Sequence, residues 1–322
     1  ELLREKWGFE GLIITDYTSV NELIEHGVAK DQKHAAELAF RAGVDVDMQS
    51  AAYHEHLAEL VKEGTFSESE LDISVRNVLS LKYDLGLFED PYRYLDSLRE
   101  KSIVYSNEIA EASLNSAKNS IILLKNDSLD GNTILPLSKD TENIAVIGPL
   151  ADNQLDLLGT WHAAGEASKV KTILESFKDR FPENSIIYEK GCEIIGNDRS
   201  GFGSAIRAAN NADLVVMTVG EKQNQSGEAA SRSNLDLPGV QKELIKEIHK
   251  TGKPVVVVVL AGRPLTIPWI AENIPAVVYA WHLGTYTSDA LLSVLSGDHN
   301  PSAKLTVTFP RNVGQIPIYY NT

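Results

Sequence analysis

The chain has 322 residues, of which 43% are hydrophobic and 23% are charged, as in an ordinary folded protein and unlike a disordered or collagen-like one. Its 45 acidic residues outnumber 30 Lys and Arg, so the formal net charge of −15 disfavours a nucleic acid as partner. The longest apolar run, residues 255–261, is too short to span a membrane, and the single cysteine, Cys192, excludes an intrachain disulfide and a cysteine zinc cluster.

The first hundred residues alternate strand-like and helix-like patterns, with carboxylates where the strand-like segments end. This order is typical of a parallel α/β architecture, in which ligands bind outside the carboxyl ends of the strands. Two strand-helix units are too few to close a barrel of eight. The expected elements are a strand at 11–15, a helix within 20–28, a helix at 32–41, a strand at 42–48 and a long helix at about 53–85.

Residues 86–96 contain Gly86, Pro91 and two tyrosines, a composition typical of the segment that ends a domain. A helix at 108–118 then leads into a second α/β set, whose strands are continuous apolar runs typical of strands covered on both faces. These strands are expected at 121–124, 144–147, 186–188, 214–219, 255–260 and 276–279, with helices at 240–251 and 287–295 among the connections.

Two carboxylates stand out by position. Asp16 directly follows the first strand, where a parallel α/β fold presents side chains to its ligand, although an Asp there also commonly caps the following turn. Glu228 lies in a long polar loop after the strand at 214–219, and such loops are often functional. A solvated surface carboxylate is the alternative for Glu228, and Glu221, nearer the strand end, is the competing candidate.

Metal and nucleotide sites find little support. His54 and His56 are two residues apart and point to different faces of a helix, and His162 suits a packed or hydrogen-bonded role better than a metal ligand. The Gly201-Phe202-Gly203 stretch lacks the third glycine and the preceding strand of a dinucleotide loop. We therefore expect no metal and no cofactor.

Several stretches in order together resemble glycoside hydrolase family 3. They are residues 7–17, 42–48, 75–88, 144–152, 227–232, 262–264 and 300–305. The resemblance implies an α/β fold in which the C-terminal strand-helix units of a TIM barrel, residues 1–95, are followed by a linker and connecting helix at 96–118 and a mostly parallel α/β sandwich at 119–322. Because the chain opens at Glu1 without Met, we expect a segment of a longer protein that lacks the N-terminal barrel and a C-terminal fibronectin-like domain. Lys33-His34 is not the family's sugar-binding Lys-His pair, because it follows Asp16 within a helical pattern.

By this resemblance Asp16 matches the nucleophile and Glu228 the acid/base of a retaining glycosidase, whose two carboxyl groups stand roughly 5–5.5 Å apart. Tyr17 and Trp161 match positions that stack on sugars, with packing at a domain interface as the alternative. The expected reaction is hydrolysis of terminal non-reducing β-D-glucosyl residues from a β-linked oligosaccharide or glucoside. A β-xylosidase, another β-glycosidase of the family, or a non-catalytic carbohydrate-binding or structural piece are alternatives. The resemblance implies a periplasmic or secreted location and is compatible with a homodimer, without a membrane or nucleic-acid partner.

Overall fold

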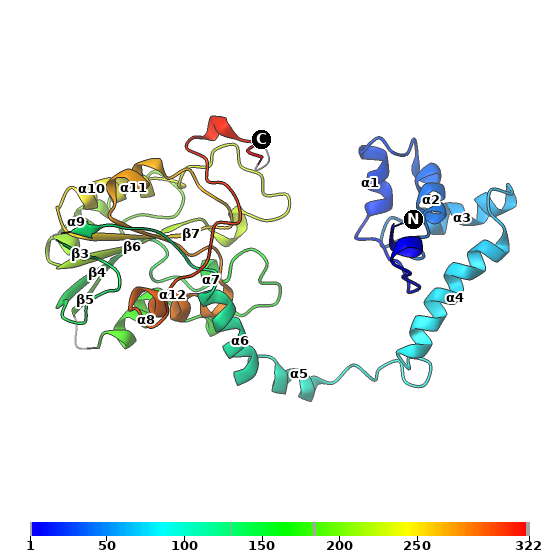
Figure 1. Ribbon diagram of the computed structural model, residues 1–322, viewed down its shortest axis with the longest axis horizontal. Helices are drawn as coiled ribbons and strands as arrows, with labels where there is room; N and C mark the ends of the chain where they lie inside the picture. The colour runs from blue at the N-terminus through cyan, green and yellow to red at the C-terminus, as the bar shows by residue number, and fades with distance from the viewer. Residues whose placement is uncertain (1, 130, 183–184, 320–322) are drawn as a thin grey trace. The chain divides into compact units, whose positions relative to one another are not determined.

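The computed structural model describes residues 2–129, 131–182 and 185–319. The chain divides into two compact units, Glu1–Ser102 and Ile103–Thr322 (Figure 1).

The first unit is helical in most of its described length. Its small core lies where three helices meet and contains Val20, Ala36, Phe40 and Leu60. The elements are a π-helical turn Leu2–Lys6 and the helices α1 Ser19–Glu25, α2 Gln32–Arg41, α3 Ala52–Lys62, α4 Glu68–Asp84 and α5 Ser97–Ile103, which ends in the second unit. The predicted helix at 32–41 is confirmed, and the one expected within 20–28 is α1, which begins one residue before that range and ends inside it.

The strands expected at 11–15 and 42–48 reduce to one isolated parallel bridge between Ile14 and Val46. Backbone bonds still hold the two segments together, because Thr15 N donates to Val46 O at 3.0 Å and Asp45 N donates to Ile13 O at 2.8 Å. Two short parallel segments without further neighbours make a weak ladder. The prediction of full strands was therefore wrong for the described residues, although the pairing of the two segments is present.

The prediction of a single helix at 53–85 was also wrong, because the structure has two helices separated by residues 63–67. Gly64, with a φ of 76°, follows the end of α3. Ser67 then begins α4 with a capping box in which its side chain accepts from Glu70 N. No residue of α4 is buried, and apolar side chains such as Ile73 and Leu79 remain exposed in its unit.

The second unit is built on a six-stranded sheet with the strand order β1-β8-β7-β6-β4-β5. All neighbours pair in parallel except β1, which runs antiparallel to β8 at one edge. The strands, all six of which were predicted, are β1 Ile122–Asn126, β4 Asn143–Ile147, β5 Ser185–Glu189, β6 Leu214–Gly220, β7 Val255–Leu260 and β8 Ala276–Tyr279. The sequence patterns did not predict the small hairpin of β2 Ser128–Leu129 and β3 Asn132–Thr133.

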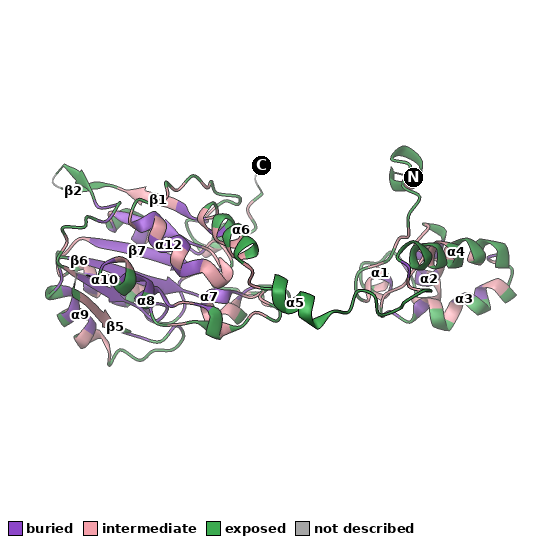
Figure 2. Cartoon of the chain, turned by 90° about the horizontal axis from the view of Figure 1, so that it is seen from below, coloured by how far each residue is buried: buried purple, intermediate pink, exposed green. Residues whose placement is uncertain are grey.

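Helices cover both faces of this sheet (Figure 1). One core cluster joins strand residues such as Val256 to α8 and α12, and the other joins residues such as Val257 to α9, α10 and α11. Every residue of β7 is buried (Figure 2), and each such valine contributes about 1.5–3 kcal/mol relative to exposure. The helices are α6 Asn107–Lys118, α7 Leu155–Leu158, α8 Ile173–Arg180, α9 Phe202–Asn210, α10 Gln241–His249, α11 Pro268–Asn273 and α12 Thr287–Leu295, with 3-10 turns at Ala167–Lys169, Gln223–Gln225, Gly284–Tyr286 and Val313–Gln315.

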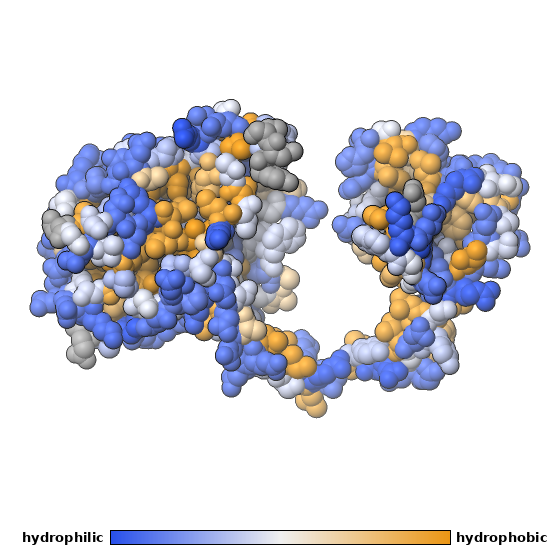
Figure 3. Space-filling view, viewed as in Figure 1, coloured by the Kyte–Doolittle hydropathy of each residue, from blue (hydrophilic) through white to orange (hydrophobic). Residues whose placement is uncertain are grey.

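The surface of the second unit shows an apolar band between more polar margins (Figure 3). Within the described ranges, no helix combines the length and the apolar character that crossing a bilayer requires.

The mostly parallel α/β sheet expected for the C-terminal part is present, and it places the ends of β6 and β7 beside each other.

Candidate active site

Asp16 lies in the first unit, two residues beyond the bridge at Ile14, and its side chain is exposed. Its Oδ1 accepts a hydrogen bond from Tyr17 N at 2.7 Å. Helix α1 has Thr18 as its N-cap, without a side-chain capping bond. The carboxylate of Asp16 therefore does not cap this helix, and the adjacent Tyr17 ring is 62% exposed within its unit.

The segment leading to Asp16 is tied down by Asp45, whose side chain is only 3% exposed. Its carboxylate accepts from Arg4 Nη2 at 3.0 Å, Ile13 N at 2.8 Å and Asn77 Nδ2 at 2.9 Å. The guanidinium of Arg4 also donates to two backbone carbonyls of the same segment, at residues 9 and 11. This partly buried network holds the backbone just before Asp16.

Glu228 lies in the second unit on the loop that follows β6, and its side chain is exposed. Among the described residues, none forms a hydrogen bond or an ion pair with its carboxylate. The flanking residues Gly227 and Ala229 both have positive φ, 102° and 55°. A side chain at position 227 would overlap Thr160, so glycine is required where the loop passes that residue. The orientation of Glu228 is consequently set by the backbone of its loop.

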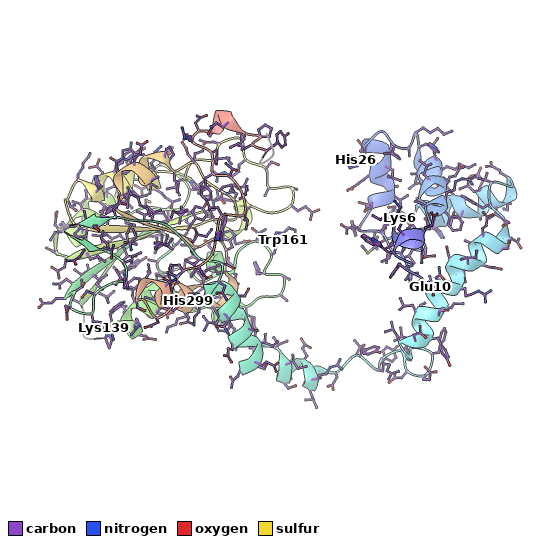
Figure 4. All side chains as sticks on the ribbon, in the orientation of Figure 1. Lys6, Glu10, His26, Lys139, Trp161 and His299 are labelled. Carbon is purple, nitrogen blue, oxygen red and sulfur yellow. The ribbon has the colours of Figure 1, made fainter. Side chains whose placement is uncertain are left out.

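Thr160 and Asp156 attach this loop to the segment that carries Trp161. The Thr160 hydroxyl lies 2.9 Å from Ser226 O and also contacts Gln223 O, while Asp156 Oδ1 accepts from Gln223 N at 2.9 Å. Figure 4 labels Trp161 at the periphery of its unit, and the side chain is 76% exposed. Hydrogen bonds therefore join the loop of Glu228 directly to the segment that carries Trp161.

A depression of about 500 Å³ lies between these two segments, lined by Trp161, Ser226, Gly227, Trp281 and His282 among others. An indole at the edge of an open depression can stack on the apolar face of a sugar ring. Burial lowers the pKa of His282 to about 4, against a smaller opposing effect of Asp156, so its imidazole is neutral at neutral pH.

The remaining candidates from the sequence are His162 and Glu221. His162 has a buried Nδ1 without a hydrogen-bond partner among the described residues, and the part of the chain that the structure describes holds no group of three or more His, Cys, Asp or Glu suited to a metal. Glu221, the competitor of Glu228, is fully buried and ion-paired with Arg232 and Arg263. Enclosed in this way, its carboxylate is unsuited to meet a ligand.

Comparison with known families covers both units. Residues 121–322 match the Glycosyl hydrolase family 3 C-terminal domain, and residues 1–81 match the Glycosyl hydrolase family 3 N terminal domain. The chain belongs to glycosyl hydrolase family 3.

Relatives within family 3 include enzymes named for two different sugars. The chain is 39% identical to the periplasmic beta-glucosidase of Salmonella typhimurium over its whole length and 40% identical to a beta-xylosidase of Formosa agariphila over 99% of it. A crystal structure of beta-glucosidase from Listeria innocua in complex with isofagomine has a TM-score of 0.89 at 37% identity and covers 100% of this chain. The chain spans 44% to 45% of the length of these three proteins.

Four residues that brace the two family 3 candidate carboxylates had no role assigned from the sequence: Asp45, Thr160, Arg232 and Arg263. Asp45, Arg232 and Arg263 lie in the stretches 42–48, 227–232 and 262–264 that carry the family resemblance, which is the signal that the sequence offers for them. Thr160 lies in none of these stretches. Their partners are too distant in sequence for a spacing rule to join them.

Proposed function

We propose that this chain is part of a retaining exo-glycosidase that removes terminal non-reducing β-D-glucosyl residues, with Asp16 as nucleophile and Glu228 as acid/base. The observation that carries the proposal is the pair of exposed carboxylates in a chain that matches both family 3 domains. Each carboxylate lies on a segment whose backbone is fixed by side-chain hydrogen bonds. Since the chain spans less than half of its relatives' length, the activity is proposed for the whole protein.

The reaction has two displacements. Asp16 attacks the anomeric carbon while the bond to the leaving oxygen breaks, and Glu228 gives its proton to that oxygen. Glu228, now a carboxylate, takes a proton from a water molecule that attacks the same carbon and releases Asp16. Two inversions leave the product with the configuration of the substrate.

Tyr17 and Trp161 are proposed to stack on the sugar. Support comes from their exposure, 62% and 76% within their own units, and from the place of Trp161 on the rim of the depression beside Gly227. An exposed aromatic ring offers a flat apolar face on which a sugar ring can stack.

We also propose the domain division into the C-terminal part of a barrel at 1–95, a connecting segment at 96–118 and a sandwich at 119–322. The limits of the two family matches, 81 and 121, support it. The periplasmic relative supports a periplasmic location for the whole protein.

A β-xylosidase is the second candidate, because a beta-xylosidase of Formosa agariphila is as similar to the chain as the Salmonella beta-glucosidase. The two sugars differ by one hydroxymethyl group, which a pocket discriminates by about 1–3 kcal/mol through its carbon alone and by more where the site hydrogen-bonds its hydroxyl. The ratio of kcat/KM for matched aryl β-glucosides and β-xylosides decides between them.

The test uses the full-length protein with two aryl β-glucosides, one with the very good leaving group 2,4-dinitrophenol and one with phenol. Asp16→Asn should abolish turnover of both. Glu228→Gln should lower kcat/KM for the phenyl glucoside by about 10²–10⁴-fold and spare the dinitrophenyl glucoside, which needs no protonation. Glu193→Gln, which removes another exposed carboxylate of the second unit, serves as control.

Unchanged rates with Asp16→Asn would contradict the mechanism, and so would a first product of inverted anomeric configuration by NMR. A non-catalytic carbohydrate-binding role predicts a different result for the chain by itself. Titration with glucose would then change the tryptophan fluorescence, and the full-length protein would hydrolyse neither glucoside.

A further inference from the structure

Arg263 closes the loop that carries Glu228. Its Nη2 donates to Ala230 O at 2.8 Å and also to Gln225 O, so one nitrogen joins the two ends of residues 226–229. Arg263 follows β7, and Glu228 follows the neighbouring β6. The contact thus fastens two adjacent strand ends to each other.

Glu221 holds this guanidinium from the other side. The Glu221 side chain is 0% exposed, and its Oε1 lies 3.3 Å from Arg263 Nε and also contacts Arg232 Nη1. Both arginine side chains are only 18% exposed. The contact between Glu221 Oε1 and Arg263 Nε is an ion pair without hydrogen-bond geometry, because Arg263 Nε has no hydrogen-bond partner among the described residues. It pairs two charged groups that would each be costly to bury alone.

Arg232 extends these contacts to the far side of the loop. Its Nη2 donates to Asp236 O at 3.1 Å, and the Asp236 carboxylate accepts from the Thr266 hydroxyl. The loop is therefore held at its start through Glu221, at both flanks of Glu228 through Arg263, and at its end through Arg232.

We propose that Arg263, held by Glu221, is a positioning residue that fixes the carboxyl group of Glu228 at the leaving oxygen. The inference rests on the proposed role of Glu228 as acid/base. Since no described residue bonds with the Glu228 carboxylate, its place depends on the backbone between Gln225 and Ala230, and a shift of about 1 Å at a reacting group can cost about 10²-fold in rate. In this role Arg263 acts through the backbone of the loop.

The experiment compares Arg263→Met and Arg263→Lys in the full-length protein, with the phenyl and dinitrophenyl β-glucosides. Lysine keeps a positive charge near Glu221 but cannot reproduce the planar fork. Both variants should lower kcat/KM for the phenyl glucoside by about 10–100-fold and that for the dinitrophenyl glucoside by less than about 3-fold. Arg199→Met, which removes an exposed arginine that pairs with Glu243 on the surface, is the matched control and should change neither rate.

A second measurement separates positioning from folding. In the Glu228→Gln background, Arg263→Lys should cause no further loss with the phenyl glucoside, because the group that it positions is already absent. Equal losses with both substrates, additive losses in the double variant, or wild-type rates would each overturn the inference. If Arg263→Met does not fold, Arg263→Lys carries the same comparison.

The failure of the proposed function has a different signature. In that case Glu228→Gln alone would lower kcat/KM equally for the two substrates, whatever the effect of the Arg263 variants. If Glu228→Gln shows the expected dependence on the leaving group and the Arg263 variants do not, only the inference about Arg263 fails.

Discussion

Gly220 lies directly against the carbonyl oxygen of Leu260, its partner in the parallel register of β6 and β7. Gly220 has a φ of 152°, and a side chain there would overlap that oxygen. The next residue, Glu221, donates its N–H to the same oxygen at 2.9 Å. The close approach therefore sets the direction in which the chain leaves β6 toward Glu228.

Gly220→Ala should destabilise the second unit strongly, because the new methyl group overlaps the backbone of the neighbouring strand. Gly252→Ala is the matched control, since Gly252 also has a positive φ, 73°, but nothing lies within 4 Å of the added carbon. We expect Gly220→Ala to cost about 1–3 kcal/mol more than the control. Urea unfolding of both variants measures the difference, and equal costs would show that the strands can move apart freely.

Gln241 should be needed for the same strand end. Its side chain is fully buried, its Oε1 accepts from Gly220 N at 2.9 Å, and its Nε2 lies 2.8 Å from Gly220 O. Gln241→Leu leaves these backbone groups unpaired and should cost about 2–4 kcal/mol in unfolding free energy.

Gln241→Glu adds a pH dependence to this loss. Nε2 also contacts the carbonyl oxygens of Ile194 and Pro238, so a carboxylate in its place would face acceptors. The new acid should therefore remain protonated in the folded state, and the variant should be less stable at pH 8 than at pH 5 relative to wild type. A pH-independent difference would contradict this expectation.

Acidification should reduce stability through His282. Burial lowers its folded-state pKa to about 4 from the ordinary 6.5, so between these values the unfolded state binds more protons. The contribution is fully present above pH 6.5 and is lost as the pH falls to 4, by up to about 3 kcal/mol. His282→Asn should remove this part of the slope, which urea unfolding at pH 7.5, 5.5 and 4 measures. Identical slopes for variant and wild type would disprove it.

Asp45 should control the order of the segment before Asp16. Asp45→Asn breaks the ion pair with Arg4 and leaves a guanidinium facing an amide, at a cost of about 2 kcal/mol. Amide hydrogen exchange at Ile13 should become faster than in wild type. Glu37→Gln, which removes the half-buried partner of the more exposed Arg41, should leave that exchange unchanged.

The hydrophobic patterns predicted the sheet of the second unit well. A run such as residues 255–260 can be satisfied only where both faces are covered, and this requirement is local enough to read from the residues. The helix break at Gly64 and Ser67 was missed because the apolar spacing continues across it, while the Gly turn and the capping box act only at the ends. The roles of Asp16 and Glu228 remain predictions.

The residue pattern is enough to predict the buried strands of the second unit, the resemblance to family 3 and the two candidate carboxylates. What holds the segments that carry these carboxylates became visible in the folded structure. Asp45 is linked to Arg4, and Arg263 to Gln225, across gaps of 41 and 38 residues. Apolar burial leaves a periodic trace along the chain, whereas a long-range ion pair or side-chain hydrogen bond depends on two groups that folding brings together, and no local spacing encodes that meeting.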